Sequence, residues 1–154
     1  MEQRPLFLLL AFVLLSGFTV LAQPQAIQPT AAVPALNVDE AVICSGVVNM
    51  QPSGMMPASA RADVQGADVP DGPFPSTVGR LYCFCKISGA APAAIKHAWY
   101  FGESLVRTID LSVDSSPWRT WSEKGIPAGM TGLWKVEIQD ANGAVLKTLA
   151  FEIK

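Results

Sequence analysis

The sequence has little of what catalytic centres and nucleic-acid surfaces require. It contains one histidine, His97, which excludes metal centres built from several imidazoles and leaves a single candidate for a histidine general base. Its eleven Lys and Arg form no run and are balanced by thirteen Asp and Glu, so we expect no nucleic-acid partner. No Gly-x-Ser-x-Gly sequence marks a serine as a nucleophile. These absences favour a non-enzymatic protein without a cofactor or a bound metal.

Segments free of helix breakers are also scarce, because twelve Gly and twelve Pro are distributed over 154 residues. This content argues against a helical bundle. The exception is the N-terminus, where Arg4 precedes the apolar run Leu6–Leu15 and a small residue, Ala22, closes the segment. That order is typical of a secretory signal peptide, so we predict cleavage of residues 1–22 and a periplasmic or secreted protein. The alternative is an uncleaved anchor, because residues 5–22 are uncharged and just long enough to span a bilayer.

Two irregular stretches divide the rest of the chain. Residues 23–38 are rich in Gln, Pro and Ala without charge, and we predict a disordered tether. Residues 39–154 are predicted to form one domain, interrupted by a long irregular loop at 50–78 that is rich in Pro and Gly. We interpret this loop as a surface insertion, with a binding loop as the alternative.

The remaining segments predict strands rather than helices. Apolar and polar residues alternate, and turn signals such as Gly102-Glu103 and Asn142-Gly143 separate the segments. The pattern predicts an all-β fold, an antiparallel immunoglobulin-like sandwich of about seven short strands. The expected strands are 40–49, 80–88, 95–101, 105–113, 118–123, 134–139 and 145–153. The expected core consists of Ile109, Leu111, Trp134, Val136, Ile138, Leu149 and Phe151.

Several short motifs within this domain are specific in combination. They are Cys-Ser-Gly-Val at 44–47, Leu-Tyr-Cys-Phe at 81–84, His-Ala-Trp-Tyr at 97–100, Trp-Arg-Thr-Trp-Ser at 118–122 and Gly-Leu-Trp-Lys-Val-Glu at 132–137. With them, residues of about 41–154 resemble the bacterial Domain of Unknown Function 2914 family, in which Lys124 also falls at a position that carries Lys. Met50-Gln51-Pro52 stands where the family usually has Arg-Glu-Pro. The resemblance implies a domain and no activity.

The three cysteines are expected to include one disulfide, because an exported domain folds in an oxidising compartment. Cys83 and Cys85 lie too close along one strand to pair with each other, so Cys44 pairs with one of them. The resemblance to the family implies the pair Cys44–Cys83, with Cys85 left as a buried free thiol. A copper site is an alternative that we do not favour. Its ligands would come from Cys83, Cys85, His97, Met50, Met55 and Met56.

The aromatic and charged residues of the motifs suggest a ligand-binding patch. Trp118 and Trp121 have opposite parity, so they point to opposite faces of a regular strand and one should remain at the surface. Arg119 shares the face of Trp121, and an aromatic ring with a neighbouring Arg can bind sugars or anions. The candidate ligand-binding residues are therefore His97, Arg119, Trp121 and Lys124. The alternative is that these side chains only pack the sandwich, with His97 as a hydrogen-bonded structural residue.

Taken together, the sequence predicts an exported, non-enzymatic β-sandwich that binds an unknown envelope protein or glycan and does not insert into a membrane after cleavage. The alternative function is a carbohydrate or small-ligand module that uses the exposed Trp and Arg patch.

Overall fold

The strand-forming segments assemble into three sheets. The structure, a computed structural model, describes residues 35–55 and 71–154. Its strands are β1 (Asn37–Cys44), β2 (Gly46–Val48), β3 (Gln51–Ser53), β4 (Asp71–Phe74), β5 (Arg80–Ser88), β6 (Ala93–Phe101), β7 (Ser104–Val113), β8 (Trp118–Gly125), β9 (Gly132–Asp140) and β10 (Val145–Ile153). No helix occurs among these described residues, and none of their segments could therefore cross a membrane as a helix.

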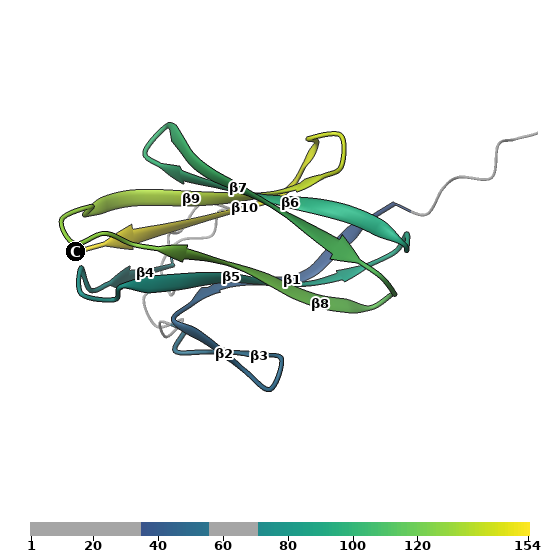
Figure 1. Cartoon of the computed structure of the whole chain (residues 1–154), viewed down its shortest axis with the longest axis horizontal. Coiled ribbons are helices and arrows are strands. Elements are labelled where there is room, and N and C mark those ends of the chain that lie inside the picture. Colours follow the sequence, from purple (N-terminus) through teal and green to yellow (C-terminus); the bar gives the residue numbers. More distant parts are fainter. Residues whose placement is uncertain (1–34, 56–70) are drawn as a thin grey trace, which may run out of the picture. The chain divides into compact units, whose positions relative to one another are not determined.

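Two of the sheets pack as the layers of a sandwich. One has the strand order β1-β5-β8 and the other has the order β4-β10-β9-β6-β7. Figure 1 shows the two layers, with the short β2-β3 sheet outside the layer that contains β5. Neighbouring strands run antiparallel except β4, which pairs in parallel with β10. The arrangement places β7 and β8 at edges of different sheets.

The core lies between these two layers because alternate residues of each strand point inward. On β9 the inward residues Trp134, Val136 and Ile138 are buried, and Phe151 of β10 stacks on Trp134 with ring centroids 6.0 Å apart. These residues and Leu149 confirm the core expected from the sequence. The expected core residues of β7, Ile109 and Leu111, are only half-buried, since β7 is an edge strand that has a neighbour on one side.

The all-β sandwich predicted from the sequence is confirmed, whereas its immunoglobulin-like character stays a prediction. Two segments are organised differently from the expectation. The first expected strand breaks at Ser45 into β1 and β2, which belong to different sheets. The stretch 50–78, expected to be irregular, contains β3 and β4. Short edge strands with Pro52 and Pro73 do not show the alternation on which the prediction relied.

The predictions for the N-terminal segments lie mostly outside the described residues. This applies to the signal peptide 1–22 and to residues 23–34 of the expected tether. The last two residues of that expected tether, Asn37 and Val38, begin β1. Of the expected loop at 50–78, residues 56–70 are likewise outside the described part.

The hairpin of β2 and β3 has a turn that constrains its tip. Val48 pairs with Gln51, which leaves Asn49 and Met50 as a two-residue turn. Both have positive φ, 51° and 57°, as a type I′ turn requires. Asn tolerates this conformation, but Met does not do so readily, because its Cβ crowds the backbone. The fold nevertheless holds Met50 there, with half of its surface exposed (52%).

Candidate functional site

An open groove lies along the edge strands β7 and β8. Its volume is about 470 Å³. One wall comes from β7, the other from β8, and the tip of the β2-β3 hairpin contributes Met50. The lining residues are Met50, Asp110, Leu111, Ser112, Trp118, Arg119, Thr120 and Trp121. The groove thus combines apolar surface with a guanidinium, a carboxylate and hydroxyl groups.

The pairing of β8 with β5 determines where its side chains point. Cys83 of β5 pairs with Ser122, and these buried residues belong to the inner face of the sheet. Trp121 pairs with Phe84 and Arg119 pairs with Lys86, and these four residues share the outer face, since directly opposite residues of a sheet lie on the same side. The prediction that Arg119 and Trp121 point the same way agrees with this register.

Both tryptophans of β8 reach the groove even though they lie on opposite faces. Trp118 is half-buried and packs against the core, and Trp121 is also half-buried. Because β8 is an edge strand, side chains from its inner and outer faces both border the space beside it. The expectation that one of the two remains at the surface is therefore too simple.

His97 does not reach this groove. It points inward from β6, is 0% exposed, and lies in a buried polar cluster with Ser122, Trp99 and Cys85. Its Nδ1 lies 2.8 Å from the Ser122 Oγ, and its Nε2 lies 3.5 Å from the Cys85 Sγ. Trp99 donates its Nε1–H to the same Ser122 Oγ at 3.0 Å.

One proton arrangement pairs every N–H and O–H group of this buried cluster. The Ser122 hydroxyl accepts from Trp99, so its single proton is free to be donated to Nδ1 of His97. The proton of the neutral imidazole then resides on Nε2 and points to the sulfur of Cys85. Burial lowers the pKa of His97 to about 4, which keeps the ring neutral at physiological pH. We assign this tautomer because it pairs every buried N–H and O–H donor of the cluster.

The distance between Ser122 and His97 resembles that of a serine nucleophile and its base. A substrate could not reach this pair as it reaches a catalytic serine, because Ser122 is only 3% exposed and His97 is not exposed. The Ser122 oxygen is already held by Trp99, and no carboxylate of the described residues is hydrogen-bonded to His97. The cluster therefore links β5, β6 and β8 across the interior.

Lys124 is separate from the groove as well. Its Nζ donates to the carbonyl of Gly125 at 2.7 Å and lies 5.9 Å from the centre of the Trp134 ring. Of the four candidate ligand-binding residues, the structure brings Arg119 and Trp121 together in the groove and places His97 and Lys124 elsewhere.

The structure does not show the predicted disulfide between Cys44 and Cys83, since all three cysteines are buried free thiols in it. The register gives the reason. Cys83 pairs with Ile43 on the inner face, whereas Cys44 pairs with Tyr82 on the opposite face. Burial raises the pKa of Cys85 to about 12 and raises that of Cys83 well above its ordinary value. No group of three or more His, Cys, Asp or Glu within the described ranges could hold a metal ion.

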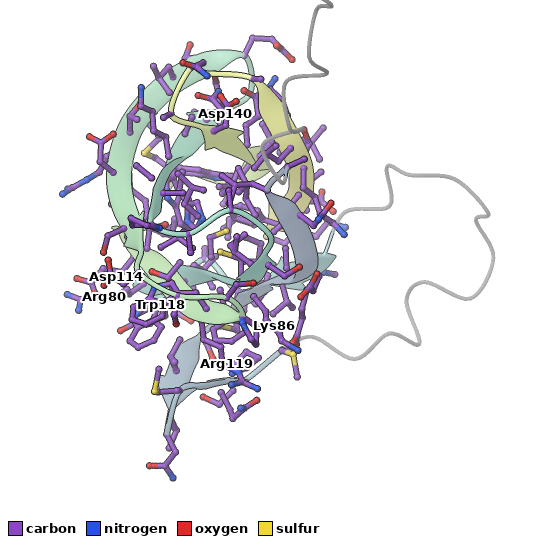
Figure 2. The ribbon with its side chains drawn as sticks, turned by 90° about the vertical axis from the view of Figure 1, so that its right-hand side faces the viewer. Arg80, Lys86, Asp114, Trp118, Arg119 and Asp140 are labelled. Carbon is purple, nitrogen blue, oxygen red and sulfur yellow. The ribbon has the colours of Figure 1, made fainter. Side chains whose placement is uncertain are left out.

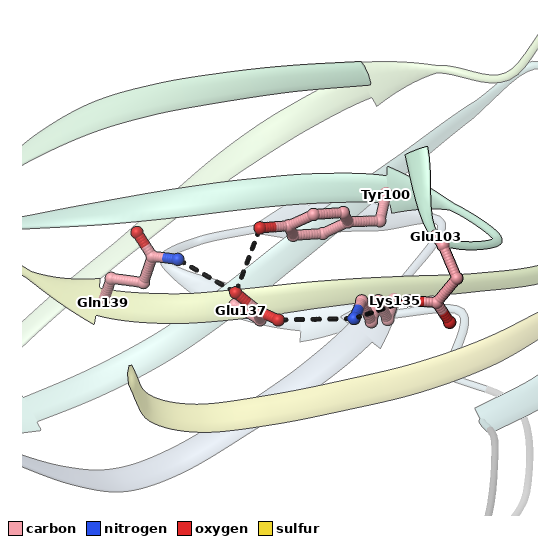
Figure 3. Close-up of polar contacts among 5 residues, drawn as sticks. All are labelled: Tyr100, Glu103, Lys135, Glu137 and Gln139. Carbon is pink, nitrogen blue, oxygen red and sulfur yellow. Dashed lines mark hydrogen bonds and ion pairs between the residues drawn. The ribbon is translucent and has the colours of Figure 1, made fainter. Parts of the chain in front are cut away.

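A second polar cluster lies on the outer face of the five-stranded sheet (Figure 3). Glu137 accepts hydrogen bonds from the Tyr100 hydroxyl at 3.2 Å and from Gln139 at 2.9 Å. Lys135 forms ion pairs with Glu137 and Glu103 and lies 4.6 Å from the centre of the Tyr100 ring. The charges of this cluster are paired with each other. The cluster therefore stabilises the pairing of β6 and β9 and leaves few unpaired polar groups to bind a ligand.

Sequence analysis did not identify this cluster, nor the part that Asp110 and Ser112 play in the groove. The outward residues of the 97–100 and 132–137 motifs, Tyr100, Lys135 and Glu137, carry a signal. The sequence alone does not show that these residues are neighbours, because their contact depends on the register that pairs Tyr100 with Lys135. Asp110 gave no signal, because the approach of β7 to β8 is a tertiary feature.

Comparison with known proteins identifies one family. Residues 92–153 match the model of a family described as Protein of unknown function (DUF2914). The match covers β6 to β10 and includes three of the five motifs, those that begin at 97, 118 and 132. It supports the resemblance from residue 92 onward, while the motifs at 44–47 and 81–84 lie before it. No curated protein matches the chain.

Proposed function

Because residues 92–153 match the model of the DUF2914 family, whose description names no activity, we propose a function from the geometry of the chain itself. We propose that it is an exported, non-enzymatic binding domain and that its ligand occupies the groove between β7 and β8. The observation that carries this proposal is the groove of about 470 Å³, in which Trp118 and Trp121 lie beside Arg119.

The groove has the surface chemistry of a carbohydrate or small-ligand site. Indole rings offer flat apolar faces on which a sugar ring can stack, while Arg119, Asp110 and Ser112 offer a donor, an acceptor and a hydroxyl. This favours the carbohydrate or small-ligand module over an unspecified envelope partner. The non-catalytic part of the proposal rests on His97, whose buried position keeps the sole imidazole away from the groove.

A glycan array tests the proposal with protein that has been expressed with its own N-terminal segment and purified after export. We expect specific binding that Trp121→Ala abolishes. Leu133→Ala is the matched control, because Leu133 is exposed (60%) on the other sheet and does not line the groove. Binding that survives in Trp121→Ala would place the ligand elsewhere.

An envelope protein as the partner remains a second candidate because β7 is an edge strand. Its N-terminal half exposes Leu105 (56%) and Val106 (38%), and a partner strand could add to this edge. Crosslinking from position 106 in intact cells, compared with crosslinking from position 147 on β10, would identify such a partner. Equal crosslinking at both positions would argue against docking on β7.

A further inference from the structure

Two cations lie directly opposite each other beside the groove. Lys86 on β5 pairs in register with Arg119 on β8, and both point to the outer face of the sheet. Figure 2 shows Lys86 and Arg119 on the same side of the ribbon, in agreement with the register that pairs them. Like charges directly opposite each other in a sheet destabilise it. The arrangement therefore needs a compensating anion to become favourable.

Among the described residues, no carboxylate forms an ion pair with either cation. The described residues contain ion pairs for Arg80 with Glu123, for Lys135 with Glu103 and Glu137, and for Lys154 with Glu152, but none for Lys86 or Arg119. Glu40 lies opposite Lys86 on β1, yet no ion pair within the described part of the chain joins them. Both cations are thus available to an external group.

The groove extends this cation pair into a larger site. Arg119 lines the groove and shares its strand face with Trp121, two residues further along β8. Asp110 and Ser112 line the β7 side. A ligand that stacks on the tryptophans would direct an anionic group toward Arg119 and Lys86 and hydroxyl donors toward Asp110. Sugar acids combine a ring with an apolar C–H face, hydroxyl groups and a carboxylate in this way.

We propose that Lys86 and Arg119 together bind the anionic group of an acidic carbohydrate that occupies the groove between β7 and β8. This inference rests on the proposed function of the groove as a ligand site. A carboxylate accepts two hydrogen bonds from a guanidinium, and the ammonium of Lys86 adds a point charge from the neighbouring strand. A sulfate or phosphate substituent has the same acceptor chemistry and would bind the same pair.

The test compares oligogalacturonate with its methyl ester, which keeps the ring and removes the charge. Titration calorimetry with the exported protein should show about tenfold tighter binding of the acid, the order expected for charge-assisted hydrogen bonds. Lys86→Gln and Arg119→Gln should each remove this preference. Lys86→Gln should also leave the affinity for the ester unchanged, because Lys86 does not line the groove. The control is Lys147→Gln, an exposed cation on β10 in the other sheet.

Two outcomes separate this inference from the proposal on which it rests. If the ester binds as tightly as the acid and Trp121→Ala abolishes the binding of both compounds, the groove is a ligand site and the proposed specificity for an anionic group is wrong. If the preference for the acid persists in a protein that carries Lys86→Gln together with Arg119→Gln, the cation pair is not the anion site.

A measurement without any carbohydrate also tests the cation pair. Inorganic phosphate, compared with chloride at equal ionic strength, should raise the melting temperature of the unaltered protein more than that of the variant with both substitutions. A variant with Arg107→Gln and Lys147→Gln has the same net charge and should respond like the unaltered protein. An equal response in all three proteins would overturn the anion site, whatever the groove binds.

Discussion

At the scale of single residues, Ser122 has the widest structural influence in the interior. One hydroxyl accepts from Trp99 and contacts His97, so a residue on β8 satisfies two ring nitrogens on β6. A buried polar group without a partner would cost roughly 1–3 kcal/mol. The cluster therefore fixes the relative position of the two sheets at this point. Apolar contacts alone would fix it less specifically, because they are not directional.

The neutral state of His97 predicts a dependence of stability on pH. Its pKa in the folded protein is about 4, below the ordinary value of 6.5. Between these values the unfolded chain binds a proton that the folded chain does not bind, so stability should fall as the pH falls from about 6.5 to about 4. The loss should be on the order of 3 kcal/mol, and His97 should contribute no slope above pH 7.

Chemical denaturation at a series of pH values measures this slope. His97→Gln is the comparison, and subtraction of its profile isolates the contribution of the imidazole. An NMR titration of the His97 ring provides a second measurement that needs no variant. Protonation of the ring near pH 6.5 in the folded protein would contradict the prediction.

Truncation of Trp134 should have a large effect on stability. Its ring is 1% exposed and lies 5.0 Å from Phe101 and 6.0 Å from Phe151, measured between ring centroids. We expect Trp134→Ala to lower the free energy of unfolding by about 3–5 kcal/mol, as for other large aromatic truncations. The neighbouring Leu133→Ala should change it by less than about 0.5 kcal/mol. Equal melting temperatures for the two variants would contradict the assigned strand parity.

The cysteines should be unreactive until the protein unfolds. All three are buried, and burial raises the pKa of each thiol, so little reactive thiolate is present. A thiol reagent should modify none of them in native protein within the time in which it modifies three in guanidinium chloride. Modification of a single thiol after unfolding would instead show that a disulfide had formed.

At the scale of elements, β8 has different roles on its two faces. Its inner face gives Ser122 to the buried cluster, and its outer face gives Arg119 and Trp121 to the groove. Such a strand cannot shift its register by one residue, because the hydroxyl and the indole would exchange faces. The pairing of Cys83 with Ser122 is thus coupled to the position of the ligand-binding residues.

The turn between β2 and β3 gives a prediction about strain. Met50→Gly should raise the free energy of unfolding by about 1 kcal/mol, since glycine adopts a positive φ without steric cost. It should also weaken ligand binding, because the Met50 side chain lines the groove. Met55→Gly is the control, since Met55 is similarly exposed but lies outside the turn and the groove. A loss of stability in Met50→Gly would show that the side chain stabilises the hairpin.

Prediction from the sequence was most successful for long alternating strands. On β9, Trp134, Val136 and Ile138 alternate with polar residues, and a half-buried sheet face is the physical reason for that pattern. The method missed β3 and β4, whose pairing is not encoded in local alternation. It also could not bring Asp110 near Arg119, because the contact between two sheet edges depends on the whole topology.

At the scale of the whole molecule, export remains a prediction with a direct test. The proposed cleavage after Ala22 would give a protein that begins at Gln23. N-terminal sequencing of protein recovered from the periplasm or the medium should find Gln23 first. A full-length chain in the membrane fraction would instead favour the uncleaved anchor.

The position of β10 has a consequence for the order in which the domain can fold. Although it is the final strand in the sequence, it lies inside its sheet between β4 and β9 and supplies Leu149, Phe151 and Ile153 to the core. A ribosome must therefore translate β10 before β4 has any partner, before β9 is paired on both sides and before the interior can close. Until then, β4 has no partner strand and the core lacks these three side chains, so pairing of the earlier strands alone cannot complete the domain.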